Sequence, residues 1–152
     1  MTFRLQEATI EDIESALTAR AISARELVDL YLHRIETLDR NGPSINSIIS
    51  LNPAARDEAA KLDEALARSG PAGPLHGVPV ILKDQIDAVG MPTTLGSILF
   101  KDYHPARDAF VVEKLKGAGA IVLGKATLGE LGMGDTHGVD ELLLRCRFSP
   151  SA

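Results

Sequence analysis

Two continuous apolar runs with a helical segment between them constrain the fold of this chain more than any other feature. Residues 78–82 (Val-Pro-Val-Ile-Leu) and 120–123 (Ala-Ile-Val-Leu) are apolar throughout, which is typical of strands covered on both faces. Between them, residues 108–117 have helical spacing, with Asp108 as the expected N-cap. Because a parallel connection needs a crossover of about this length, the pattern predicts parallel or mixed pairing in an α/β sheet.

The first third of the chain is predicted to be helical. Thr9 with Asp12 and Ser23 with Glu26 each place a hydroxyl three residues before a carboxylate, the pattern of a capping box at a helix start. The second helix carries one apolar stripe and is expected to stop at Asn41-Gly42. The predicted fold class is therefore α/β, with N-terminal helices followed by part of a mixed sheet with helices.

Two further elements lie between the helical third and the apolar runs. Residues 45–51 resemble a short strand, and Asn52-Pro53 supplies an N-cap and a first-turn proline for a third helix. That helix is expected to run to about residue 70, where Gly-Pro-Ala-Gly-Pro forms a turn-rich connector.

Composition argues against several classes of protein. A formal charge of −5 and 4% aromatic residues among 152 disfavour nucleic-acid binding. The single Cys146 has no internal partner, the N-terminus lacks the pattern of a secretory signal, and no apolar run is long enough to span a membrane. We therefore expect a cytoplasmic protein without a membrane segment.

The four histidines are scattered, without the paired spacings of metal ligands, so we expect neither a metal site nor a cofactor. His76, in the turn before residues 78–82, is expected to be structural. Residues 119–125 match a phosphate-binding loop until Ala126 replaces the required Ser or Thr. Such a loop needs exposed backbone amides, whereas this stretch has the composition of a buried strand, so nucleotide binding is disfavoured.

Lys83 follows the first apolar run directly. Composition alone favours a strand-end lysine with its ammonium in solvent. The surrounding motifs change that interpretation, because they occur in the order seen in the amidase signature family, which this chain resembles over about residues 8 to 138. The matching motifs are Gly73-Pro-Leu-His-Gly-Val-Pro-Val-Ile-Leu-Lys83-Asp84, Gly90-Met-Pro-Thr-Thr94-Leu-Gly-Ser97, Asp108-Ala-Phe-Val-Val112, Leu115-Lys-Gly-Ala-Gly-Ala-Ile-Val-Leu-Gly-Lys-Ala-Thr127 and Glu130.

The resemblance implies a Ser-cisSer-Lys triad that hydrolyses carboxamides, with Lys83 as the general base. That role requires a neutral amine, so burial would have to depress the lysine pKa from its usual value of about 10.4. Adjacent Asp84 leaves two alternatives. It can point to the opposite face of the strand, or it can pair with Lys83 and favour the ammonium. By rough alignment with the family, Met133 and Gly134 would line the acyl pocket.

The chain departs from the family after Gly138. Family members continue with a Gly/Ser-rich segment that carries both serines and the oxyanion hole, whereas residues 139–152 contain no glycine. Ser149 and Ser151 are poor substitutes, because a nucleophile must be firmly positioned. We therefore interpret residues 1–138 as the N-terminal portion of an amidase-like domain, and residues 139–152 as a divergent, flexible tail of a truncated or frame-shifted product.

Three functions follow from this interpretation. The first is an amidase fragment that keeps the lysine base but is inactive alone, with a carboxamide substrate only if it is completed. The second is an amidase segment completed in trans by another chain, with possible self-association beforehand. The third is a non-enzymatic α/β binding or scaffold domain. A lysine Schiff-base enzyme is a more distant alternative.

Overall fold

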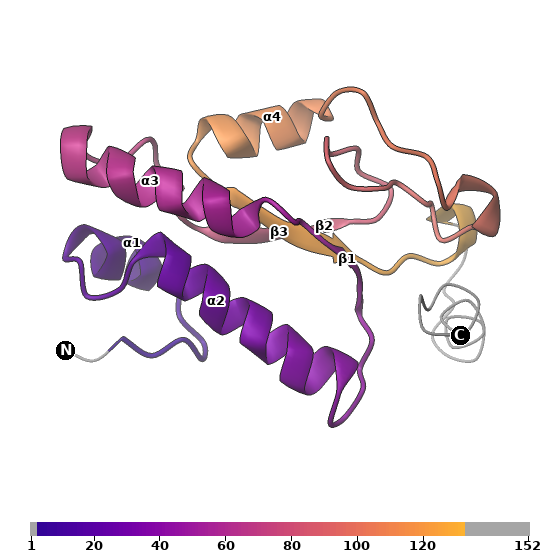
Figure 1. The fold of residues 1–152 in the computed structure, drawn as a ribbon, viewed down its shortest axis with the longest axis horizontal. Coiled ribbons are helices and arrows are strands. Elements are labelled where there is room, and N and C mark those ends of the chain that lie inside the picture. Colours follow the sequence, from indigo (N-terminus) through magenta and orange to yellow (C-terminus); the bar gives the residue numbers. More distant parts are fainter. Residues whose placement is uncertain (1–2, 133–152) are drawn as a thin grey trace.

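The computed structural model describes residues 3–132, and its helices surround a small sheet (Figure 1). Met133, Gly134, Ser149, Ser151 and the predicted tail lie outside the described residues. The elements, in chain order, are α1 (Ile10–Thr18), α2 (Ala24–Arg34), the π-helical η1 (Ile35–Arg40), β1 (Ile48–Leu51), α3 (Ala55–Ser69), β2 (Pro79–Lys83), the 3-10 turn η2 (Ile98–Phe100), α4 (Phe110–Gly117), β3 (Ile121–Ala126) and the 3-10 turn η3 (Glu130–Gly132).

The three described strands form a mixed sheet in the order β1-β3-β2. β2 pairs parallel with β3, as the crossover predicted, and β1 pairs antiparallel with β3. The β2–β3 register skips Leu123: Val80 faces Val122, and Ile81 already faces Gly124. This β-bulge reverses the alternation of side chains along β3. After it, Leu82 pairs with Lys125 and Lys83 pairs with Ala126.

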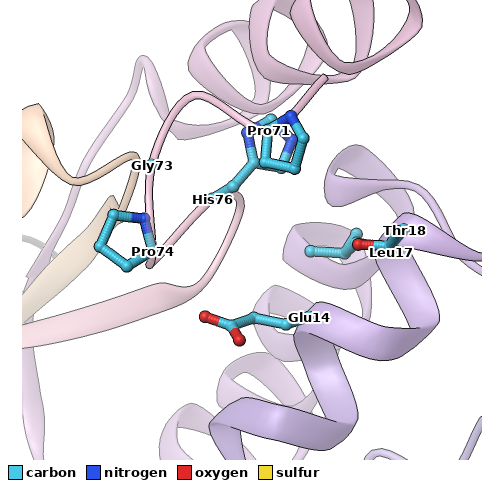
Figure 2. A pocket seen from close by; sticks show the side chains of 7 residues that line it. All are labelled: Glu14, Leu17, Thr18, Pro71, Gly73, Pro74 and His76. Atoms are coloured by element: carbon cyan, nitrogen blue, oxygen red, sulfur yellow. The ribbon is translucent and has the colours of Figure 1, made fainter.

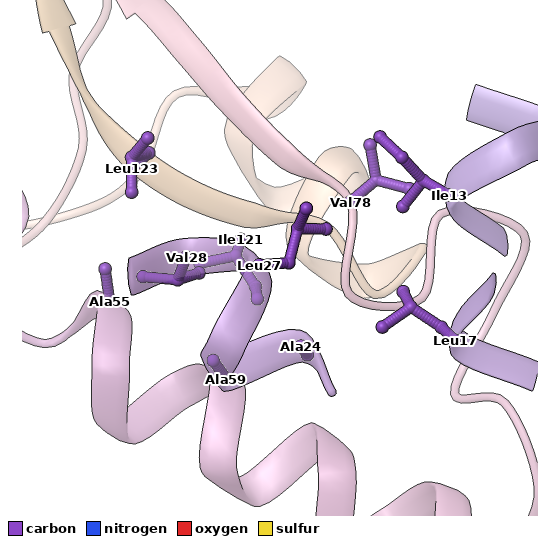
Figure 3. Close-up of a cluster of buried hydrophobic side chains, with 10 residues drawn as sticks. All are labelled: Ile13, Leu17, Ala24, Leu27, Val28, Ala55, Ala59, Val78, Ile121 and Leu123. Carbon is purple, nitrogen blue, oxygen red and sulfur yellow. The ribbon is translucent and has the colours of Figure 1, made fainter. Parts of the chain in front are cut away.

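Helices cover the sheet on both faces (Figure 1). On one face, α1, α2 and α3 contribute to a buried cluster with Val78, Ile121 and Leu123 (Figure 3). On the other face, Val112 of α4 packs with Leu82, Val122 and Met91. Because one strand residue in two points to each face, the single apolar run of β3 supplies both clusters. The mixed α/β fold predicted from the sequence is confirmed.

Two of the four predicted helix starts agree with the structure. Thr9 and Ser23 cap α1 and α2 through complete capping boxes. The prediction for Asp108 is wrong: α4 begins after Ala109, and Asp108 instead accepts hydrogen bonds from the Val89 amide at 2.7 Å and from Lys116 Nζ at 2.7 Å. These long-range partners satisfy the carboxylate, so it does not turn back onto its own helix.

Two predicted elements begin later in the structure than the sequence indicates. The strand expected over residues 45–51 pairs only at Ile48–Leu51. α3 starts at Ala55, because the Asn52 side chain accepts from the Ala54 amide in a turn before the helix. Among residues 3–132, no helix is both long enough and apolar enough to cross a lipid bilayer.

Candidate active site at the carboxyl ends of two parallel strands

Lys83 is the last residue of β2, at the edge of the sheet where β2 and β3 both end. Its side chain is exposed, and Nζ donates a hydrogen bond to the backbone carbonyl of Thr127, just beyond β3. The carboxyl ends of parallel strands are a common position for ligand sites in α/β sheets. The described part of the chain therefore presents Lys83 at this edge, but it does not supply the burial that a lysine base needs.

Asp84 points away from Lys83, which decides between the two alternatives left by the sequence. Asp84 is buried. Its carboxylate accepts hydrogen bonds from Thr94 Oγ1 at 2.6 Å, from the Thr94 amide at 3.2 Å and from the Gly96 amide at 3.0 Å. The alternation of strand residues separates the two side chains, and the loop after β2 then captures the carboxylate.

Lys125 of β3 is a second lysine at the same edge, and its side chain is fully buried. Its Nζ donates to Thr93 Oγ1 at 2.6 Å, to the Pro92 carbonyl at 2.8 Å and to the Asp84 carbonyl at 3.2 Å. Burial lowers the pKa of Lys125, while the charges of Asp84 and Asp87 oppose that shift. The three acceptors lie at the two ends of the turn formed by residues 84–93, so Lys125 holds this turn closed.

Sequence reasoning considered Lys125 as part of a failed phosphate-loop pattern and of a family motif, and it assigned this lysine no role of its own. The structure agrees that there is no such loop here, because Ile121–Ala126 is a buried strand. The available signal was a lysine near the end of an apolar strand, which is unusual because lysine is almost never fully buried without partners.

The remainder of the loop after β2 also closes this edge of the sheet, by bonding to the segment after β3. Ser97, which is fully buried, donates from Oγ to Glu130 Oε1 at 2.9 Å, and the Leu131 amide donates to the Leu95 carbonyl at 2.7 Å. These bonds hold the loop after β2 against the segment that follows β3. Since Thr127 lies at the start of that segment, the acceptor of the Lys83 amine is positioned by the same contacts.

His76 lies at the opposite end of β2 and does not take part in this arrangement. Its ring is buried; Nδ1 accepts a hydrogen bond from the Ala72 amide at 3.0 Å, and Nε2 has no partner within residues 3–132. Burial lowers its pKa, opposed by the charge of Asp63. The histidine borders a cavity of about 130 Å³ between α1 and the connector before β2 (Figure 2).

The described residues contain no group of three or more His, Cys, Asp or Glu side chains that could hold a metal ion. Of the site residues predicted from sequence, the structure describes Lys83 alone, since Met133 and Gly134 fall outside it.

The candidate site is thus a lysine at the carboxyl end of a parallel strand, with the neighbouring carboxylate turned away from it. Comparison with known proteins identifies the family. The family model described as Amidase matches residues 26–138. The chain belongs to the amidase family, as the signature motifs in its sequence indicated.

Two kinds of protein are among the relatives. A glutamyl-tRNA(Gln) amidotransferase subunit of Halorhodospira halophila is 41% identical over 133 residues, which is 88% of this chain and 27% of that protein. A probable amidase of Arabidopsis thaliana is 42% identical over 132 residues, covering 85% of this chain and 25% of the relative. The chain thus spans about a quarter of the length of the curated relatives that it matches.

Solved structures agree with the family assignment. The native peptide amidase of Stenotrophomonas maltophilia superimposes with a TM-score of 0.81 at 41% identity, over 84% of this chain and 26% of that one. An amidase family protein of Bacillus anthracis gives a TM-score of 0.78 at 38% identity, over 83% and 25%. The described fold is therefore similar to one portion of these much longer proteins.

Proposed function

We propose that this chain supplies the general base, Lys83, of a carboxamide hydrolase of the Ser-cisSer-Lys type, and that it does not hydrolyse amides by itself. The observation that carries the proposal is the state of the Lys83 side chain. Its amine lies at an open edge of the sheet and is bonded to a backbone carbonyl, while the carboxylate of Asp84 is held by Thr94 and Gly96. A nearby carboxylate favours the charged form of a lysine, so an amine without such a partner gives up its proton more readily and can serve as a base.

The further requirements are two serines and a cover for Lys83. In the proposed reaction, the nucleophilic serine oxygen bonds to the carbonyl carbon of the amide, and its proton passes through the bridging serine to the Lys83 amine. The C–N bond then breaks as the leaving amine takes up a proton, and water hydrolyses the acyl-serine ester. A serine-bearing segment packed over the Lys83 edge would also exclude water, and burial favours the neutral amine.

Complementation tests this proposal. The 152-residue chain is mixed with a polypeptide that comprises the serine-bearing remainder of the Stenotrophomonas maltophilia peptide amidase, and ammonia release from a peptide carboxamide is measured. We expect no release from either component alone and release from the mixture. Lys83→Ala should abolish it, whereas Lys101→Ala should not, because the Lys101 side chain is about half exposed and its ion-pair contact is a 3.9 Å approach to Asp102.

A non-enzymatic binding or scaffold domain is the second candidate, and the two apolar clusters favour it. Each face of the sheet has its own set of buried residues, as expected of a part that can fold alone. This candidate predicts a monomer with a cooperative thermal transition and no hydrolysis in the complementation assay. Self-association without a cooperative transition would instead favour an incomplete amidase segment.

A further inference from the structure

Two lysines and one aspartate meet at the end of the parallel strand pair, on different faces of the sheet. Lys83 pairs with Ala126, and Lys125 pairs with Leu82. Residues directly opposite one another share a face, so Lys125 lies with Leu82 on the face that α4 covers, called the buried side below. Lys83 lies on the other side. Asp84, one residue beyond Lys83, returns to the buried side, where Lys125 binds its carbonyl at 3.2 Å.

The buried side therefore contains the Asp84 carboxylate and the Lys125 amine, which bind the hydroxyls of two consecutive threonines. Lys125 binds the Thr93 hydroxyl, and the next residue, Thr94, donates its own hydroxyl to Asp84. The charges that act on Lys125 are those of Asp84 and Asp87. A buried carboxylate without a nearby positive charge is costly, and Lys125 is the lysine whose amine binds both ends of the turn that begins at Asp84.

The exposed alternative partner for Asp84 is its neighbour, Lys83. If the buried lysine were removed, moving the Asp84 carboxylate out of the interior would lower the free energy of the folded chain. Lys83 is the closest cation along the chain. An ion pair there would hold Lys83 in its charged form and oppose its use as a base.

We propose that Lys125 is a positioning residue: it keeps Asp84 buried on one face of the sheet and thereby leaves the Lys83 amine without a carboxylate partner on the other. This inference rests on the proposed function of Lys83 as the base. It assigns the buried lysine an indirect role, since Lys125 is enclosed by the turn of residues 84–93 and does not reach the exposed edge.

Pulse acylation of the 152-residue chain tests the inference without requiring hydrolysis. The chain is exposed briefly to acetic anhydride across a pH series, and acylation of Lys83 is quantified by peptide mass spectrometry, because the reagent modifies the neutral amine. Lys125→Met should move the Lys83 labelling curve to higher pH by at least about one unit, the effect of a close opposite charge. Lys114→Met removes one positive charge from the exposed face of α4 and should leave the curve unchanged.

The double variant Lys125→Met/Asp84→Asn separates this role from general damage to the fold. Removing the carboxylate should return the Lys83 curve to that of the wild type. A Lys125→Met curve that overlays the wild-type curve would overturn the inference, as would a double variant that keeps the shifted curve. Circular dichroism of each variant reports whether it has folded.

If Lys125→Met does not fold, Asp84→Asn alone carries the test. With Asp84 committed to the buried side, its neutralisation should leave Lys83 labelling unchanged, whereas a shift of the curve to lower pH would reveal an existing Lys83–Asp84 pair and refute the inference. Labelling as expected together with failed complementation would refute the proposed function while leaving the positions of these three side chains established.

Discussion

The hydroxyl of Thr94 donates a hydrogen bond of 2.6 Å to the carboxylate of Asp84, and both residues are buried. This bond crosses the loop that follows β2, so it joins the residue beside Lys83 to the far end of that loop. It is one of three hydrogen bonds to the same carboxylate.

Replacing Thr94 by valine should destabilise the fold by about 1.5 to 3 kcal/mol, the range for a hydrogen bond to a charged group. The shape of the side chain is kept, so the loss reports the hydroxyl. Urea unfolding followed by circular dichroism measures it. Thr37→Val is the matched control: its exposed hydroxyl bonds to the His33 carbonyl one turn earlier in the chain, and a loss as large as that of Thr94→Val would contradict the assigned role.

Substitution of Asp39 should also lower the free energy of unfolding strongly. It is buried, and its carboxylate accepts from the Ser47 amide at 2.5 Å, from Ser47 Oγ at 2.6 Å and from the Ile48 amide at 3.2 Å. Asp39→Ala leaves these donors unpaired and should cost about 2 to 4 kcal/mol, more than one charged hydrogen bond. Hydrogen exchange at the Ser47 amide should accelerate in parallel.

The comparison for Asp39 is Asp29→Ala, which removes the 2.6 Å ion pair with Arg56 on the surface. Both of these side chains are about half exposed, so the loss should be no more than about 1 kcal/mol. Equal losses at positions 29 and 39 would show that the link between η1 and β1 does not stabilise the fold.

Stability should fall with acidity near pH 6 because of His76. Burial lowers the pKa of His76 below its usual 6.5, so the unfolded chain takes up a proton before the folded chain does. The stabilisation is complete above about pH 6.5 and is lost as the pH falls toward the folded-state pKa, by at most about 1.4 kcal/mol per pH unit.

Denaturant unfolding between about pH 7 and 5 measures this slope. His76→Asn should flatten it, since the asparagine cannot be protonated. His33→Asn should not, because His33 is exposed on α2. Asp12 and Glu26 also have lowered pKa values, but carboxylates titrate below this window. An unchanged slope in His76→Asn would remove His76 as its source.

Gly96→Ala should be far more damaging than Gly90→Ala. Both glycines have positive φ angles, of +65° and +89°, and alanine costs about 1 to 2 kcal/mol in such a conformation. At Gly96 the added Cβ would also approach the Leu128 carbonyl oxygen to 2.3 Å, whereas at Gly90 nothing lies within 4 Å.

The additional overlap at Gly96 should add about 1 to 3 kcal/mol and separate the loop after β2 from the segment after β3. Thermal unfolding of the two variants measures the difference. Equal melting temperatures would mean that this close contact is not needed for the fold.

Local features were predicted well because their partners lie close in sequence. Thr9 and Ser23 find their capping carboxylates three residues away, and the crossover between two apolar runs is enough to predict a parallel pair. The cap predicted at Asp108 failed for the opposite reason: its partners are Val89, 19 residues distant, and Lys116, eight residues distant. Nothing in the spacing of α4 marks those contacts.

The sequence by itself determined the family, the α/β class and Lys83 as the candidate base, because motifs, apolar runs and helix caps are properties of neighbouring residues. Only the tertiary structure decided which side chains share a face at the edge where β2 and β3 end. Simple alternation would place Lys125 with Ile121 and Leu123, but the bulge at Leu123 turns it to the side of Leu82 and Asp84. A bulge is a property of two paired strands, so the buried lysine and the orientation of Asp84 emerge only when β2 and β3 meet.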